Sequence, residues 1–349
     1  MKKSYLIIAA AALAMASCSK ENIVDSVNDN ETVAITFEQF VNKATKSEIT
    51  NETALASADG FRVWGYKAKN VASGETIAWD NDDAKLVIFD DVQVSYASSE
   101  WSYSPLKFWD KTCSYRFYAG GPVAHTNGTL DCIASGDAYM KFTVEGAVSA
   151  PATESFSDFV IDRIVNQTNA STINDPTYRE GFDFHHIMAK ISFAVKKSGT
   201  LTASDDLVLT DIKMSGYNAA SGDFEQKKFD GTWGVLNTSE WSQTATASGE
   251  TVQLASGEAL EFDAKETNLV KDYIMVPQQI AANTLKFTVS YTLNGEEFTD
   301  QEGTLANAQT WGTDSHVTYT ITVGPQAILF DVNTVCSFCV ASGDAISIE

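Results

Sequence analysis

From residue 33 onward the chain repeatedly alternates apolar and polar residues with a period of two, the period of a β-strand. Asn294-Gly295, which lies between two alternating runs, predicts a hairpin with a type I′ turn. A helix is predicted only over residues 153–164. The pattern predicts an all-β fold, with one face of each strand on a core and the other in solvent. The clearest alternating segments are residues 33–37, 61–66, 191–195, 285–293 and 317–323.

A polar stretch at residues 166–181, which contains Pro176 and Gly181, divides the chain of 349 residues into two strand-rich halves. A length of this size suits two domains better than one. We therefore predict two β-sandwiches in tandem, at residues 32–175 and 176–349. Residues 1–17 are expected to be a signal peptide and residues 18–31 a flexible stalk.

The start of the chain has the pattern of an export signal. Lys2 and Lys3 precede an apolar run at residues 5–16, which is too short to cross a bilayer but suits the core of a signal peptide. Small residues then precede Cys18, as in a bacterial lipobox, so Cys18 is the predicted site of acylation. The alternative is an ordinary signal peptide with an incidental cysteine.

The charge of the chain excludes several partners. Lys and Arg number 24 and Asp and Glu number 46, which gives a formal net charge of −22. A surface this acidic repels phosphate backbones, so no nucleic acid partner is expected. Hydrophobic residues make up 44% of the chain, enough for a sizeable core.

Histidine and cysteine offer little support for metal chemistry. His185 and His186 are neighbours, and on one strand they would point to opposite faces and could not hold one metal ion. Cys336 and Cys339 form a CxxC motif without the second pair that a zinc site requires. Free thiols and disulfides both remain open for Cys113, Cys132, Cys336 and Cys339, and the sequence does not fix their pairing.

The acidic and aromatic clusters have structural interpretations as well as functional ones. The turn at residues 80–83 lacks the glycine of an EF-hand loop, because Lys85 occupies that position. The aromatic segments at residues 101–103 and 108–109 fit a core better than a carbohydrate platform. No hydrolase motif is present, and no pair among the acidic residues is singled out for glycosidase chemistry. We expect neither an enzyme nor a cofactor or metal.

An ordered series of short blocks resembles the fimbrillin family, the lipoprotein-derived pilins and accessory subunits of fimbriae on Gram-negative anaerobes. The blocks follow the Cys18 signal and extend over nearly the whole mature chain. They lie at residues 33–37, 61–66, 101–109, 115–119, 184–193, 212–216, 273–278 and 311–323.

The resemblance implies two transthyretin-like β-sandwiches and assembly by strand exchange. In that family a protease cuts after a basic residue and removes the first strand, here residues 33–40. Lys43 and Lys46 are the nearest basic residues after it. The family often uses Arg at the cut, whereas the first Arg of this chain is Arg62, inside the next strand.

A partner's C-terminal segment would then fill the opened groove by β-augmentation. The candidate donor segment is residues 327–335, with apolar Ile328, Phe330 and Val332. The expected partners are other fimbrial subunits, in a homo- or heteropolymer, a lipid anchor in the outer membrane, and a host or bacterial surface ligand. The expected location is the cell surface. The resemblance thus implies a structural or adhesive subunit of surface fimbriae, with stalk, tip and anchor positions left open. The alternative function is a surface glycan-binding lipoprotein with a β-sandwich fold.

Overall fold

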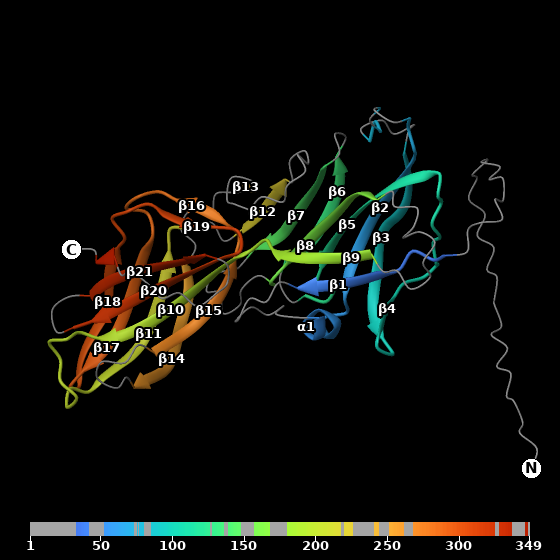
Figure 1. Cartoon of the computed structure of the whole chain (residues 1–349). Coiled ribbons are helices and arrows are strands. Elements are labelled where there is room, and N and C mark those ends of the chain that lie inside the picture. Colours follow the sequence, from blue (N-terminus) through green and yellow to red (C-terminus); the bar gives the residue numbers. More distant parts are fainter. Residues whose placement is uncertain are drawn as a thin grey trace, which may run out of the picture.

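The computed structural model describes residues 33–41, 52–72, 75, 77–79, 85–125, 128–135, 139–147, 157–167, 180–217, 220–225, 241–243, 251–261, 268–324, 328–336 and 346–347. These residues form an elongated all-β molecule, with the strands gathered at two ends (Figure 1). The predicted fold class is confirmed. Among the described residues the single helix is α1 (Glu52–Ser57).

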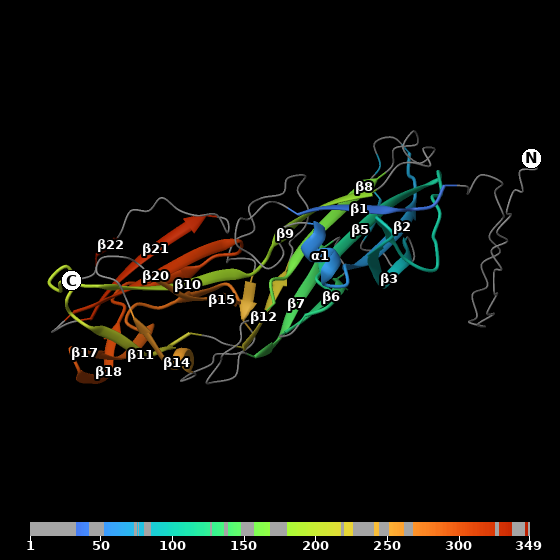
Figure 2. The same ribbon diagram turned by 90° about the horizontal axis from the view of Figure 1, so that it is seen from below.

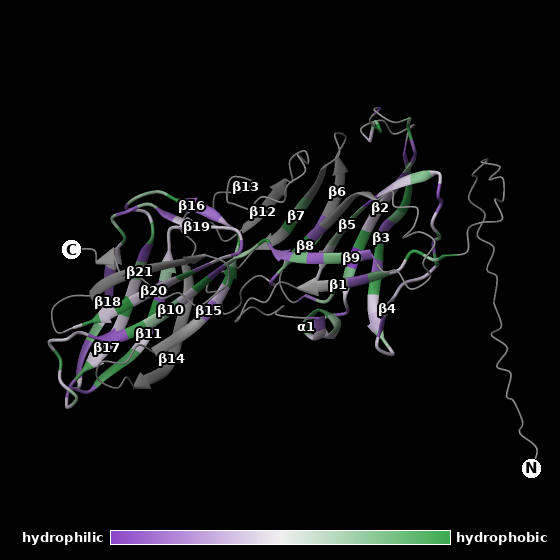
Figure 3. Cartoon of the chain, viewed as in Figure 1, coloured by the Kyte–Doolittle hydropathy of each residue, from purple (hydrophilic) through white to green (hydrophobic). Residues whose placement is uncertain are grey.

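At one end lies a seven-stranded sheet of order β1-β9-β8-β5-β2-β3-β4. Most neighbours are antiparallel, but β1 runs parallel to β9. The strands are β1 (Phe37–Val41), β2 (Phe61–Lys69), β3 (Lys85–Ala97), β4 (Glu100–Ser102), β5 (Cys113–Gly121), β8 (Val160–Gln167) and β9 (Glu180–His186). Along β9, buried Phe182 and Phe184 alternate with more exposed residues, which gives the strand its banded hydropathy (Figure 3).

A four-stranded sheet of order β13-β12-β7-β6 contributes to the core at this end. Its strands are β6 (Thr129–Ser135), β7 (Tyr139–Ala147), β12 (Ala220–Glu225) and β13 (Trp241–Gln243). Phe142 of β7 meets Trp64 of β2 at a ring-centroid distance of 6.2 Å. This contact places β7 against one face of β2.

The other end contains two larger sheets, which Figure 2 shows as separate layers. One has the order β15-β10-β20-β21-β22 and the other β14-β11-β17-β18. Phe193, Phe287 and Tyr319 meet between the layers, with ring centroids 5.3–5.9 Å apart. A small additional sheet pairs β16 (Gln278–Ile280) with β19 (Gln309–Trp311). The strands of the two larger sheets are β10 (Ala189–Lys197), β11 (Leu207–Ser215), β14 (Thr251–Glu261), β15 (Asn268–Met275), β17 (Lys286–Leu293), β18 (Glu296–Thr304), β20 (Ser315–Val323), β21 (Ile328–Cys336) and β22 (Ile346–Ser347).

Sheet pairing crosses the position at which the sequence suggests a domain boundary. β9, β12 and β13 follow residue 175, yet they pair with β1, β8 and β7, or with one another, at the first end. The chain passes from one end of the molecule to the other between β9 and β10 (Figure 1). The division into two tandem sandwiches stays a prediction.

The structure corrects two local expectations. The helix predicted over residues 153–164 is wrong, because Val160 begins β8, which pairs with β5. Solvent was expected on one face of each strand, but β2 buries both faces. Phe61 and Val63 pack in one apolar cluster, whereas Trp64 and Tyr66 pack in another, so neighbouring residues are both inside.

Two other features agree with the sequence. Asn294 and Gly295 have φ of 53° and 84° between paired Leu293 and Glu296, which confirms the predicted hairpin. β18, the second strand of that hairpin, ends its sheet and is largely exposed. Carboxylates crowd this edge strand, at Glu296, Glu297, Asp300 and Glu302.

Candidate functional site

The first segment of the described chain, residues 33–41, joins two edges that are far apart in the sequence. On one side, Ile35 N donates to Lys107 O at 2.8 Å and Trp109 N donates to Val33 O at 3.1 Å. On the other side β1 pairs with β9, and Glu180 N donates to Thr36 O at 2.7 Å. We call the region between β9 and residues 103–109 the strand slot, which residues 33–41 fill.

Phe37 of this segment is enclosed by other aromatic rings. It is 2% exposed, and its ring contacts those of four residues with centroids 5.3–5.7 Å away. Ile35 is fully buried in the same cluster. Because they lie two positions apart, both side chains face inward. The four rings, which we call the Phe37 cage, are Phe89, Tyr103, Phe117 and Phe182.

The segment expected to be the first strand is therefore observed in part as a strand. The sequence predicts residues 33–40, whereas β1 comprises Phe37–Val41, and Ala34 forms an isolated bridge with Phe108. Tyr103 Oη donates to Ile35 O at 2.7 Å and secures the bridge region. Burial raises the pKa of Tyr103 to about 12, so the hydroxyl remains a donor at neutral pH.

The other predicted site residues lie elsewhere. Cys18, Lys43 and Lys46 fall outside the described residues. Ile328, Phe330 and Val332 lie in β21, which pairs antiparallel with β20, and Phe330 stands opposite Ile321. On its other side β21 pairs with β22 only at Asp331 and Val332.

The aromatic segments form part of the core rather than an exposed platform. Trp109 is 2% exposed and Trp101 is 9% exposed. The indole Nε1 of Trp101 donates to Glu52 Oε1 at 3.0 Å, and its ring contacts Phe61 at 5.1 Å. Phe108 alone of these residues is well exposed. The interpretation of Trp101 and Trp109 as core residues is confirmed.

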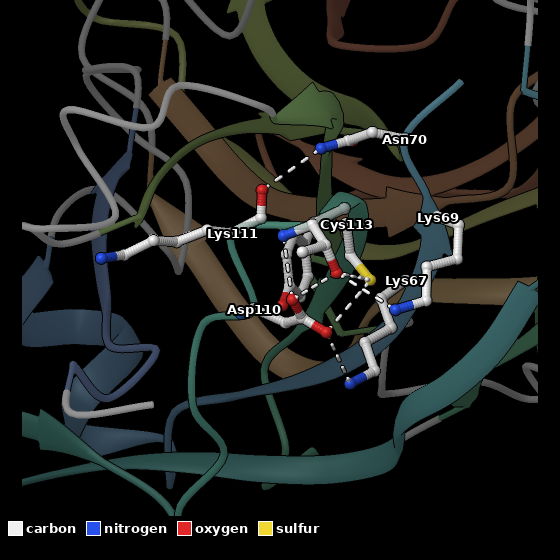
Figure 4. Close-up of polar contacts among 8 residues, drawn as sticks. Lys67, Lys69, Asn70, Asp110, Lys111 and Cys113 are labelled. Atoms are coloured by element: carbon white, nitrogen blue, oxygen red, sulfur yellow. Dashed lines mark hydrogen bonds and ion pairs between the residues drawn. The ribbon is translucent and has the colours of Figure 1, made fainter. Parts of the chain in front are cut away.

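The groups around Cys113 keep its thiol protonated (Figure 4). The thiol is buried, is not in a disulfide, and donates to Asp110 Oδ2 at 3.4 Å. Thr112 donates to the same carboxylate through its backbone and its hydroxyl, and Lys67 Nζ lies 3.9 Å away. Burial and the Asp110 carboxylate raise the pKa of Cys113, which disfavours the thiolate needed for redox or nucleophilic chemistry.

A Ser, a His and an Asp meet on neighbouring strands, but not as a catalytic triad. Ser192 Oγ donates to Asp272 Oδ1 at 2.5 Å and contacts His316 Nε2 at 2.5 Å. In a triad the carboxylate would orient the imidazole, whereas here it binds the serine. Lys190 Nζ lies 2.7 Å from Asp272 Oδ2, and Ser192 is only 1% exposed. This arrangement is a structural ion pair with two hydrogen-bonded neighbours.

A second buried cluster joins the end of β9 to the segments before β8 and β20. His186 Nδ1 lies 2.8 Å from Asp158 Oδ1, and both side chains are almost fully buried. Burial disfavours the imidazolium, but the Asp158 and Asp314 carboxylates outweigh it and raise the pKa of His186. Burial raises the pKa of Asp314 to about 6. The neighbouring His185 is half-buried, so the two histidines face opposite ways, as predicted.

The described parts of the chain contain neither a membrane-spanning helix nor a cluster of metal-binding side chains. None of the helices there is long and apolar enough to cross a bilayer. Nor do three or more His, Cys, Asp or Glu side chains gather there in a way that could hold a metal ion.

Stacked sheets with a strand slot define an all-β protein whose first segment completes its core. The chain belongs to the fimbrillin-like family, whose sequence profile matches residues 43–337. The family resemblance inferred from the sequence is thereby confirmed.

Solved structures extend the comparison to the fold. A fimbrial protein from Bacteroides vulgatus ATCC 8482 is 18% identical, with a TM-score of 0.63 over 87% of this chain and 99% of that chain. A fimbrial assembly protein from Parabacteroides distasonis ATCC 8503 is 12% identical, with a TM-score of 0.37 over 90% of this chain and 99% of that chain. The first of these shows that the fold is shared. A search of the curated proteins finds no match.

Proposed function

We propose that this protein is a structural subunit of surface fimbriae, exported as a lipoprotein and assembled by strand exchange. Membership of the fimbrillin-like family supports the fimbrial role and a non-enzymatic one. The observation that carries the assembly mechanism is the strand slot. A single terminal segment there completes both a hydrogen-bond ladder and the aromatic core.

Export begins with the signal peptide at residues 1–17, and Cys18 is acylated where that peptide is removed. Lipid chains on this residue hold the protein at the outer membrane, because each buried CH₂ contributes about 0.8 kcal/mol. Residues 19–31 then separate the lipid from the folded part. The protein reaches the cell surface in this tethered form.

Cleavage after Lys43 or Lys46 releases residues 33–41 from the rest of the chain. Ile35 and Phe37 leave the core, so the cluster they filled opens to water. Trp109 N and Glu180 N lose their acceptors, Val33 O and Thr36 O. An apolar groove with unpaired backbone groups readily binds another strand.

The donor is the C-terminal segment of another subunit, for which residues 327–335 of this chain are the candidate. Ile328, Phe330 and Val332 are spaced as the inward residues of a strand. A chain with both an openable slot and a donor can extend a fibre in both directions, as a stalk subunit requires.

Mass spectrometry of fibres sheared from native cells tests this proposal. A mature N-terminus at Ala44 or Ser47 is the expected result. An acylated Cys18 terminus in the fibres would mean that the slot stays closed, and would replace the stalk assignment with an anchor or tip position. Absence of the chain from purified fibres would refute the fimbrial role.

A matched pair of variants separates cleavage from folding. Replacing both Lys43 and Lys46 with Ala is expected to leave a folded surface lipoprotein that no longer enters fibres. Lys20→Ala, in the predicted stalk, is the control and is expected to leave fibre assembly unchanged.

A further inference from the structure

Two short segments from opposite ends of the chain have nearly the same sequence. Residues 34–38 read Ala-Ile-Thr-Phe-Glu, and residues 327–331 read Ala-Ile-Leu-Phe-Asp. Three positions are identical and a fourth keeps the acidic type. The first segment fills the strand slot, and the second contains the start of β21.

We propose that a second copy of this chain fills the slot in a defined register, with Ile328 at the position of Ile35 and Phe330 in the Phe37 cage. This inference rests on the proposed strand exchange and specifies its partner. The partner is the same protein, so the subunit is complementary to itself.

The pattern of burial supports this register. Ile35 and Phe37 are the two positions of the segment with at most 2% exposure, and both are identical in the second segment. Thr36 is half-buried, and it is replaced by Leu329. Glu38 is exposed, and Asp331 retains its charge. The positions that contact the core are therefore the ones that match.

The same register reproduces the backbone contacts of the slot. Ile328 N would donate to Lys107 O in place of Ile35 N, and Leu329 O would accept from Glu180 N in place of Thr36 O. Ile328 O would accept from Tyr103 Oη. The incoming strand then keeps the chain direction of β1 and runs parallel to β9.

A shift by one residue would be strongly disfavoured. Because side chains alternate along a strand, a shift of one position would place Leu329 or Asp331 in the Phe37 cage and turn Phe330 outward. A carboxylate among four aromatic rings has no partner to offset its lost hydration. The alternation thus excludes odd shifts, and the identical Ile and Phe positions of the two segments select this register among the even ones.

Joining the slot of one copy to the segment of the next gives a heterologous contact, which continues as a fibre unless a rotation closes it into a ring. Among the described residues of its own chain, β21 pairs with β20 along its whole length and with β22 at two residues. Since the slot forms hydrogen bonds with both sides of the strand it holds, β21 must leave β20 to fill the slot of another copy.

Peptide exchange tests the register with the mature chain, residues 19–349, carrying a specific protease site in place of residues 43–49. The chain is cut at that site, and a fluorescent peptide of residues 325–335 is added in excess. Anisotropy is expected to rise with the cut chain and to stay low with the uncut chain. A peptide of residues 31–41 serves as the reference occupant.

Two variant peptides probe the register. Phe330→Ala is expected to bind about a hundredfold more weakly, because a buried Phe is truncated. Leu329→Ala, at the half-buried Thr36 position, is the matched control and is expected to bind within about threefold of the parent peptide.

The outcomes separate three claims: the strand exchange, the identity of the partner and the register. If residues 31–41 enter the cut chain but residues 325–335 do not, the self-complementary partner is refuted while strand exchange with another subunit stands. If neither peptide enters, strand exchange itself fails, and this inference fails with it. Equal losses for Phe330→Ala and Leu329→Ala would refute the register even though the peptide binds.

Discussion

The buried Asp314 carboxyl makes the stability of the protein depend on pH near neutrality. Its pKa rises from the usual 3.8 to about 6 in the folded chain, because burial disfavours its charge more strongly than the attraction of His186, itself opposed by repulsion from Asp158, favours it. At about 1.36 kcal/mol per pKa unit, this shift corresponds to roughly 3 kcal/mol. Since the folded pKa is raised, the contribution is fully present below pH 3.8 and is lost as the pH rises through about 6.

Asp314→Asn removes this ionisation and is suited to the backbone, because Asn tolerates the left-handed φ of 53° found there. Relative to the parent protein, the variant is expected to gain about 2 kcal/mol between about pH 4.5 and about pH 7.5. Urea unfolding followed by tryptophan fluorescence at the two pH values measures this difference.

Asp205→Asn is the matched control. Hydrogen bonds from Asn294 and Thr202 lower the pKa of the exposed Asp205 to about 2, so its carboxylate is ionised at both pH values. Its replacement is expected to change stability equally at both. If the difference between Asp314→Asn and the parent were the same at the two pH values, the argument from the buried carboxyl would be refuted.

Three further predictions concern packing and the backbone. Phe37→Ala is expected to destabilise the uncut protein by about 3–5 kcal/mol in chemical unfolding, and a cost no larger than that of the exposed neighbour variant Glu38→Ala would contradict the cage. Gly295→Ala is expected to lower the free energy of unfolding by about 1 kcal/mol, because the φ of +84° strains any residue with a Cβ even though no atom lies near that position. An unchanged denaturation midpoint would argue against the turn geometry. Trp311→Phe removes the 2.8 Å bond from Nε1 to the buried Tyr319 Oη and is expected to cost about 1–3 kcal/mol in the same assay, whereas a neutral result would mean that the hydroxyl finds another partner.

The period-two pattern was sufficient to predict the fold class and the hairpin at Asn294, because both depend on residues close together in the sequence. It could not predict that Trp64 is buried, since that face of β2 is covered by β7, a strand far along the chain. Nor could it distinguish β8 from a helix. Val160 and Ile161 are adjacent and both fully buried, so the start of the strand has no exposed face to reveal its period.

The strand slot was predicted in part, because the strand that fills it has a local sequence pattern. The alternation of residues 33–37 identified an inward-facing first strand, and Phe37 falls within it. The aromatic cage was not predicted, because Phe89, Phe117 and Phe182 come from three strands that the fold brings together. The Asp158–His186 pair was missed as well, since no local spacing links residues on different segments.

The acidic edge strand β18 has a consequence for specificity in crowded surroundings. An open sheet edge recruits other strands indiscriminately, so copies of a protein with such an edge aggregate at high concentration. Glu296, Glu297, Asp300 and Glu302 place charge along this edge, so two copies that meet there repel each other. In the proposed fibre, a charged flank of this kind confines the contacts between copies to the strand slot and the donor segment.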